Sequence, residues 1–115
     1  MDERLEKALD FSNYMVTLNN QKRMALQEFY QNSVYYFNSG QFSVTKETLS
    51  FCQMLLANGQ EDCILLDDND TPIMIENLKT FVQDLLNVYF SATNEYFSTY
   101  SKIKQSRSVE KLINE

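Results

Sequence analysis

The stretch from Glu76 to Lys104 contains neither proline nor glycine, and it constrains the fold more than any other part of the sequence. Its apolar residues recur every three or four positions, which places them on one face of an α-helix. This stripe consists of Leu78, Val82, Leu85, Tyr89, Ala92, Tyr96 and Ile103. A second stripe beside it consists of Phe81, Leu86, Phe90, Phe97 and Tyr100. We therefore predict one long helix over Glu76–Lys104, about 43 Å long at the usual helical rise.

Together the two stripes cover more of the helix circumference than a surface helix usually buries. One interpretation is that the other helices of the chain wrap this helix. The other is that one stripe contacts a second copy of the protein, because twofold pairing is the commonest way to cover such a surface. On the second interpretation we predict a homodimer whose interface contains Tyr89, Tyr96, Phe97 and Tyr100. Tyrosine suits this place because its ring is apolar and its hydroxyl tolerates water.

Two further helices are expected before the long one. Apolar residues at helical spacing predict a helix over Asp2–Asn38, either continuous or jointed at Asn19-Asn20. Gly40 supplies its stop, since glycine readily adopts the left-handed conformation that closes a helix. Thr45 is a candidate N-cap for the next helix, and Asn58-Gly59 is its expected end.

A β-hairpin is expected between the second helix and the long one. The apolar runs Cys63–Leu66 and Thr71–Ile75 flank Asp67-Asp68-Asn69-Asp70, a cluster of turn-forming residues. Pro72 cannot donate a ladder hydrogen bond, so its strand belongs at an edge, and Phe42–Val44 is a candidate third strand. The predicted fold class is α+β and mainly α, with three main helices and one small β-hairpin before a long C-terminal helix, in a single domain of residues 1–115.

The sequence offers no chemical motif. An EF-hand loop needs oxygen ligands at its first, third and fifth positions and glycine at the sixth, but Pro72 occupies the sixth position counted from Asp67 and the fifth counted from Asp68. We expect a solvated turn there. The chain has no histidine, and its only cysteines are Cys52 and Cys63, which excludes Ser-His and Cys-His nucleophiles. We predict no catalytic residue, no cofactor, no metal ligand and no enzymatic activity.

The net charge of the chain and its distribution indicate which class of partner the protein binds. Sixteen acidic against ten basic residues give a formal charge of −6, which does not favour nucleic acid or anionic lipid as a partner of the whole surface. The C-terminal end is nevertheless basic, with Lys102, Lys104, Arg107 and Lys111. An alternative hypothesis is therefore a nucleic-acid-binding accessory protein, whose order of helix, strand, helix and hairpin matches part of a winged helix-turn-helix. Against it, the hairpin tip carries three aspartates, which phosphate would repel.

No apolar run reaches the length of a membrane span, and the first residues have no secretory h-region, so we expect a cytoplasmic protein. The chain also resembles known proteins in three segments, Tyr36–Phe42, Leu66–Pro72 and Arg107–Leu112. In these segments it resembles small proteins of unassigned role encoded by T4-like phages of marine cyanobacteria. The resemblance implies a phage accessory protein in a bacterial host and assigns no site residue. Our leading hypothesis is a non-enzymatic interaction protein that acts through protein–protein contacts.

Overall fold

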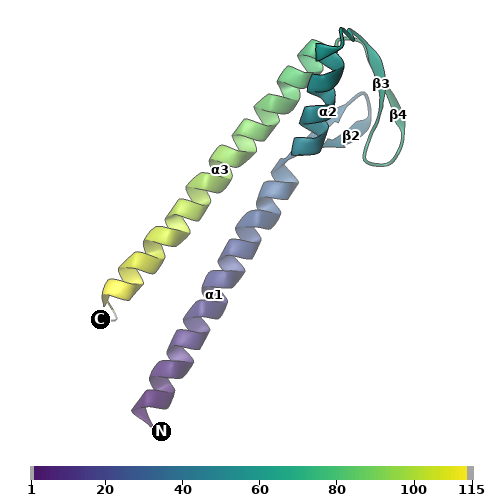
Figure 1. Ribbon diagram of the computed structural model, residues 1–115. Coiled ribbons are helices and arrows are strands. Elements are labelled where there is room, and N and C mark those ends of the chain that lie inside the picture. Colours follow the sequence, from purple (N-terminus) through teal and green to yellow (C-terminus); the bar gives the residue numbers. More distant parts are fainter. Residues whose placement is uncertain (1, 114–115) are drawn as a thin grey trace. The chain divides into compact units, whose positions relative to one another are not determined.

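The structure is a computed structural model that describes residues 2–113, and the side chains of residues 2–105. Its elements, drawn in Figure 1, are α1 (Glu3–Asn32), β1 (Val34–Phe37), β2 (Gly40–Ser43), α2 (Lys46–Ala57), β3 (Cys63–Leu66), β4 (Pro72–Ile75) and α3 (Leu78–Ile113). The predicted class, α+β and mainly α, is confirmed, as is the long C-terminal helix. The structure has two β-hairpins, where one hairpin and a candidate third strand were expected.

The chain forms two compact units. Unit 1 comprises the described residues of Met1–Phe29 and Glu95–Glu115, and unit 2 comprises Tyr30–Asn94. Both boundaries fall inside uninterrupted helices, α1 and α3. The division therefore does not by itself separate two domains, and the single domain expected from the sequence stays a prediction.

The hairpin of β1 and β2 corrects the prediction that one helix continues to Asn38. Val34–Phe37 is a strand that pairs antiparallel with Gly40–Ser43. Asn38 and Ser39 both have positive φ, 47° and 66°, as the two-residue turn that matches strand twist requires. The prediction failed because Val34 and Phe37, three positions apart, fit the helical spacing, whereas Tyr35 and Phe37, two positions apart, share the strand face that meets Phe81. The run Val-Tyr-Tyr-Phe also has the β-branched and aromatic composition of a strand.

The hairpin of β3 and β4 forms nearly where it was predicted, with Leu66 paired to Pro72 next to the turn. Phe42, expected as part of a possible third strand, lies in β2 and pairs with β1 instead. The long helix is N-capped by Asn77, whose side-chain oxygen accepts a hydrogen bond from Thr80 N at 3.1 Å. It therefore begins at Leu78 rather than at Glu76, and it continues beyond Lys104 to the end of the described residues.

α2 begins and ends as predicted. The side chain of Thr45 accepts a hydrogen bond from Thr48 N at 3.1 Å, which identifies it as the N-cap. Gly59 has a φ of +84°, and the N–H groups of Gly59 and Gln60 donate to the carbonyls of Leu56 and Leu55. This is the Schellman arrangement, in which a left-handed glycine satisfies the last carbonyls of a helix.

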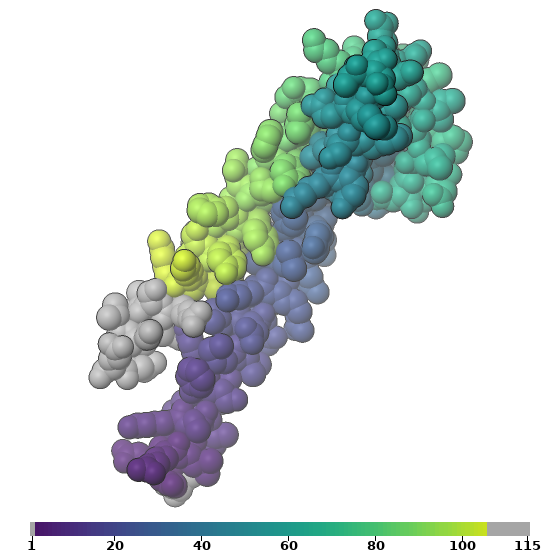
Figure 2. All heavy atoms as spheres, in the orientation of Figure 1, coloured from purple at the N-terminus to yellow at the C-terminus, as the bar shows by residue number. Residues whose placement is uncertain are grey.

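The core of unit 2 is built around Phe81 of α3, which is 1% exposed. The rings of Tyr35, Phe37 and Phe42 from the first hairpin meet it edge to face, with centroid distances of 5.7, 5.4 and 5.2 Å. Further buried members come from α2, β3, β4 and α3: Cys52, Leu65, Ile73, Ile75, Leu78, Val82 and Leu85. In the space-filling view the atoms of α2 and of the adjoining start of α3 lie against one another (Figure 2). The first stripe of α3 is thus core within unit 2.

Unit 1 pairs its part of α1 with its part of α3 in antiparallel fashion. The rings of Phe29 and Tyr96 meet edge to face at 5.3 Å. About two helical turns before Phe29 on α1 and one turn after Tyr96 on α3, a second contact forms. The ammonium of Lys22 lies 5.8 Å from the centroid of the Tyr100 ring. α1 is continuous through Asn19-Asn20, which settles the boundary that the sequence left open.

Candidate interaction surface

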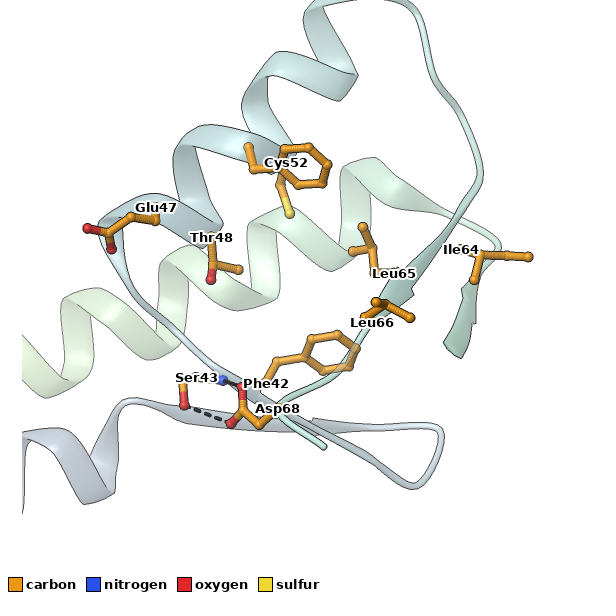
Figure 3. Close-up of a pocket in the computed structure, with 10 residues that line it drawn as sticks. Phe42, Ser43, Glu47, Thr48, Cys52, Ile64, Leu65, Leu66 and Asp68 are labelled. Carbon is orange, nitrogen blue, oxygen red and sulfur yellow. Dashed lines mark hydrogen bonds between the residues drawn. The ribbon is translucent and has the colours of Figure 1, made fainter. Parts of the chain in front are cut away.

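An open groove of about 460 Å³ lies between α2 and β3 within unit 2. Figure 3 shows Cys52 reaching it from α2, and Leu65 and Leu66 from β3. Phe51 on α2 is 50% exposed, and Ile64 and Leu66 are each 63% exposed. Large apolar side chains gathered half-exposed around one concavity mark a binding surface more than scattered ones do. We call this feature the α2–β3 groove and treat it as the candidate interaction surface.

The exposure of these side chains follows from local structure. Successive side chains of a strand point to opposite faces, so Leu65 enters the core while Ile64 and Leu66 face outward. On α2 the apolar face is wider than the core can cover, because Phe51 and Met54 flank the buried Cys52 and stay about half exposed. The extra width was visible in the sequence, but the sequence could not show that β3 would lie beside it.

Two carboxylates, Glu47 and Asp68, line the groove as well. Asp68 accepts hydrogen bonds from Ser43 N at 3.0 Å, Ser43 Oγ at 2.7 Å and Gln41 Nε2 at 3.2 Å, and Figure 3 shows its side chain beside Ser43. Between Tyr30 and Asn94 the sequence has eight acidic and two basic residues, a formal charge of −6. The surroundings of the groove therefore attract a positively charged partner.

In the acidic turn Asp68, Asn69 and Asp70 are exposed, as expected of a solvated turn, whereas Asp67 is buried. Its Oδ1 accepts hydrogen bonds from Thr71 N at 2.8 Å and Asn69 N at 2.9 Å, and its Oδ2 accepts one from Gln41 N at 3.1 Å. The bond from Thr71, followed by that from Gln41, lowers the pKa of the Asp67 carboxyl because both favour its ionised form. The turn joins the second hairpin to the first.

The four residues predicted for a dimer interface have different environments. Tyr89 packs against the core of unit 2. In unit 1, Tyr96 contacts Phe29 and stacks on Tyr100 with centroids 6.2 Å apart. Phe97 is 72% exposed, the most exposed of the four. Tyr89 and Tyr96 thus serve packing within the chain, and Phe97 is the one whose side chain is mainly solvent-facing.

Of the four basic residues proposed for nucleic-acid contact, Lys102 and Lys104 are exposed side chains of α3. The side chains of Arg107 and Lys111 lie outside the described residues. The formal charge of the sequence that contributes to unit 1 is zero, with eight acidic and eight basic residues. Unit 1 thus lacks the excess of positive charge that is typical of a nucleic-acid-binding surface, and contact of these residues with nucleic acid stays a prediction.

The remaining ionisable groups with shifted pKa values lie in or beside the core. The hydroxyl of Tyr35 donates to Asp84 Oδ2 at 2.8 Å, and burial together with this bond raises the pKa of Tyr35. Burial raises the pKa of the Cys52 thiol to about 11, and burial together with the charge of Asp62 raises that of Cys63. Both thiols are free. A raised pKa makes them poor nucleophiles near neutral pH.

The described residues hold no group of three or more histidine, cysteine, aspartate or glutamate residues placed to bind a metal ion. None of their helices combines the length and the apolar character needed to cross a membrane.

Comparison with protein families, with curated proteins and with solved structures gave no match. The resemblance to phage proteins therefore stays a prediction, and the functional argument depends on the geometry of the chain itself.

Proposed function

We propose that this chain is a non-enzymatic interaction protein that binds a protein partner in the α2–β3 groove. The observation that carries the proposal is the placement of Phe51, Ile64 and Leu66. These three apolar side chains are at least half exposed and surround one concavity. Because about half of each side chain is still exposed, burying it against a partner would contribute roughly 1 kcal/mol.

The acidic balance of unit 2 supports a partner with basic residues. It disfavours the alternative of nucleic-acid binding at the groove, because phosphate would meet the carboxylates of Glu47 and Asp68 in a unit whose formal charge is −6. In keeping with the resemblance to phage proteins, we place this activity in the cytoplasm of a bacterial host.

The test compares two glutamate substitutions of phenylalanines with similar exposure, both in unit 2. Phe51→Glu introduces a charge into the groove, whereas Phe90→Glu introduces one on α3 outside it, where Phe90 is 54% exposed. We expect immobilised wild type and Phe90→Glu to capture the same partner from an extract of the host cell, and Phe51→Glu to lose it. Equal capture by both variants would contradict the groove as the binding surface.

We also propose that the protein is a homodimer that uses the outer part of α3. Phe97 supports this, since a phenylalanine that is 72% exposed has apolar surface left for a second copy. Unit 1 supports the dimer too. Among the described residues of α1 in that unit, only Leu18 and Ala25 are buried, so the other apolar residues of this part of α1 keep exposed surface that a second copy can cover.

The dimer is tested by light scattering on Phe97→Glu beside Tyr36→Glu, a control on β1 with the same 72% exposure. We expect wild type and Tyr36→Glu to have about twice the chain mass of 13.5 kDa, and Phe97→Glu to have the mass of one chain. A wild-type mass of 13.5 kDa at micromolar concentration would refute the dimer. A dimer that persists in Phe97→Glu would place the interface elsewhere.

A further inference from the structure

The α2–β3 groove runs along the outer edge of β3. Ile64, Leu65 and Leu66 all line it, although successive side chains of a strand point to opposite faces. Three consecutive strand residues can border one groove only where the groove follows the backbone edge between the two faces. The groove therefore offers backbone groups as well as side chains.

The register shows which backbone groups these are. Asp67 N donates to Thr71 O at 3.0 Å, so the pair Asp67–Thr71 occupies a hydrogen-bonded position of the hairpin. Hydrogen-bonded and non-hydrogen-bonded pairs alternate in an antiparallel ladder. Leu65 therefore bonds to β4, while the N–H and C=O groups of Ile64 and Leu66 point away from it. Within the described part of the chain, no other hydrogen bond is made to these outward groups.

The edges of two other strands are occupied. On β2 the outward N–H groups of Gln41 and Ser43 donate to the carboxylates of Asp67 and Asp68, and Gln41 O accepts from Asp68 N at 2.8 Å. On β4, Pro72 has no N–H to offer, and Met74 O accepts a hydrogen bond from Asn38 Nδ2 at 3.4 Å. Proteins commonly protect strand edges in such ways. The edge of β3 at Ile64 and Leu66 lacks this protection.

We propose that an extended segment of a partner protein, with apolar residues flanked by lysine or arginine, adds to β3 as a third strand in the α2–β3 groove. This inference deepens the proposed function and rests on it. The backbone of the segment pairs with the outward N–H and C=O groups of Ile64 and Leu66. Alternate side chains of the segment meet Phe51 on one side of the new strand, which is the usual division between affinity and specificity in strand addition.

The charges flanking β3 decide between a partner and a second copy. Glu61 and Asp62 precede the strand, and Asp67 and Asp68 follow it. If two copies paired antiparallel through β3, the acidic pair at one end of each strand would face the acidic pair at the other end of its mate. Like charges directly opposite one another destabilise a strand pair. A segment with basic residues at both ends would instead meet opposite charges.

The first experiment measures binding of the full chain to an array of short peptides in which varied apolar residues are flanked by lysine at both ends. A matched array has glutamate at every lysine position. We expect several lysine peptides to bind, and their affinity to fall as salt rises and screens the charges. Absence of binding to the lysine peptides at about millimolar concentration, or equal binding to the glutamate peptides, would overturn the proposal.

The second experiment tests backbone pairing with the best peptide from the array. A peptide N-methylated on the alternate amides that face β3 loses its donors, whereas one methylated on the other alternate amides keeps them. We expect one of the two isomers to lose binding and the other to retain it. If both bind like the parent peptide, the segment does not add as a strand.

The third experiment changes the protein. Leu66→Pro removes an outward N–H without removing a bond between β3 and β4, so we expect the hairpin to form. Leu66→Ala is the control, because it removes the same groove-lining side chain and keeps the N–H group. We expect the affinity of Leu66→Pro to be about tenfold or more below that of Leu66→Ala. Circular dichroism establishes that both variants are folded. Equal affinities of the two variants would refute pairing at this edge.

These results also separate the inference from the proposed function. If Phe51→Glu loses the cellular partner while Leu66→Pro retains it, the groove binds a protein but not by strand addition, and the inference fails alone. If wild type is a dimer that Leu66→Pro dissociates, a second copy occupies the edge and the proposed basic partner is wrong. If Leu66→Pro and Phe51→Glu both lose the partner and the lysine peptide, both proposals are supported.

Discussion

Replacement of Gly40 by alanine should destabilise the protein through one contact between the two hairpins. Gly40 is buried at the start of β2. A Cβ atom at this position would lie 2.8 Å from Cγ1 and 3.0 Å from Cδ1 of Ile73, a buried residue of β4. Carbon atoms pack no closer than about 3.5 Å without repulsion. Either the side chain of Ile73 or the hairpin that carries it would have to move.

Two opposing effects set the magnitude. Alanine reduces the conformational entropy of the unfolded chain, which stabilises a protein by about 0.4–1 kcal/mol when the native backbone accepts it. Overpacking a filled site costs about 1–3 kcal/mol. Because Ile73 is only 6% exposed, it has little room to move, so the second effect dominates. We expect Gly40→Ala to lower the free energy of unfolding by about 1–2 kcal/mol.

A double-mutant cycle with Ile73→Ala, measured by urea unfolding and circular dichroism, isolates this contact. In the Ile73→Ala background both close side-chain atoms are gone and the backbone oxygen of Phe37, 3.2 Å from the added Cβ, is the remaining tight contact, so most of the loss caused by Gly40→Ala should disappear. Gly59→Ala is the control: its Cβ would meet nothing within 4 Å, but its φ of +84° is strained for alanine, which costs about 1–2 kcal/mol whether or not Ile73 is present. Equal losses from Gly40→Ala in both backgrounds would refute the steric argument.

Two further predictions follow from shifted pKa values. Because the pKa of Asp67 is lower in the folded protein than the ordinary 3.8, its stabilisation is present above that value and is lost as the pH falls through the folded pKa; Asp67→Asn should therefore flatten the acid limb of a plot of melting temperature against pH. Cys52 is buried and its pKa is about 11. A Cys63→Ser variant, in which Cys52 is the one remaining thiol, should therefore react with a thiol reagent near neutral pH only as fast as it unfolds. Rapid labelling without denaturant would contradict this.

The helices were predictable because their signals are local and agree with one another. Thr45 and Gly59 mark both ends of α2, and the absence of proline and glycine after Pro72 allows one continuous α3. The first hairpin was not predicted because Val34 and Phe37 have helical spacing, while Tyr35 and Phe37 in the same run have the alternate spacing of a strand. Tertiary packing selects the strand over the helix, since Phe37 contacts Phe81 of α3, forty-four positions along the chain.

The candidate groove was only partly predictable. The sequence shows that α2 carries more apolar residues than one core face needs, and that Ile64 and Leu66 alternate with Leu65 in β3. It does not show that α2 and β3 border a common groove, because that depends on how the hairpins pack. The surplus apolar residues on α3 predict a dimer surface, but their spacing does not show which of them stay exposed: Tyr96 packs within unit 1, whereas Phe97 is 72% exposed.

The carboxylates of the acidic turn contribute both to the charge near the groove and to the packing of the two hairpins. The effect of charge on peptide binding must therefore be tested at a different residue. Asp67 and Asp68 hold the edge of β2 through Gln41 and Ser43, so their removal would loosen both hairpins and change binding indirectly. Glu47 lines the groove and makes no such bond to β2. A change in peptide affinity after Glu47→Gln would therefore report the field around the groove, whereas the same change after Asp68→Asn would also report the joint between the hairpins.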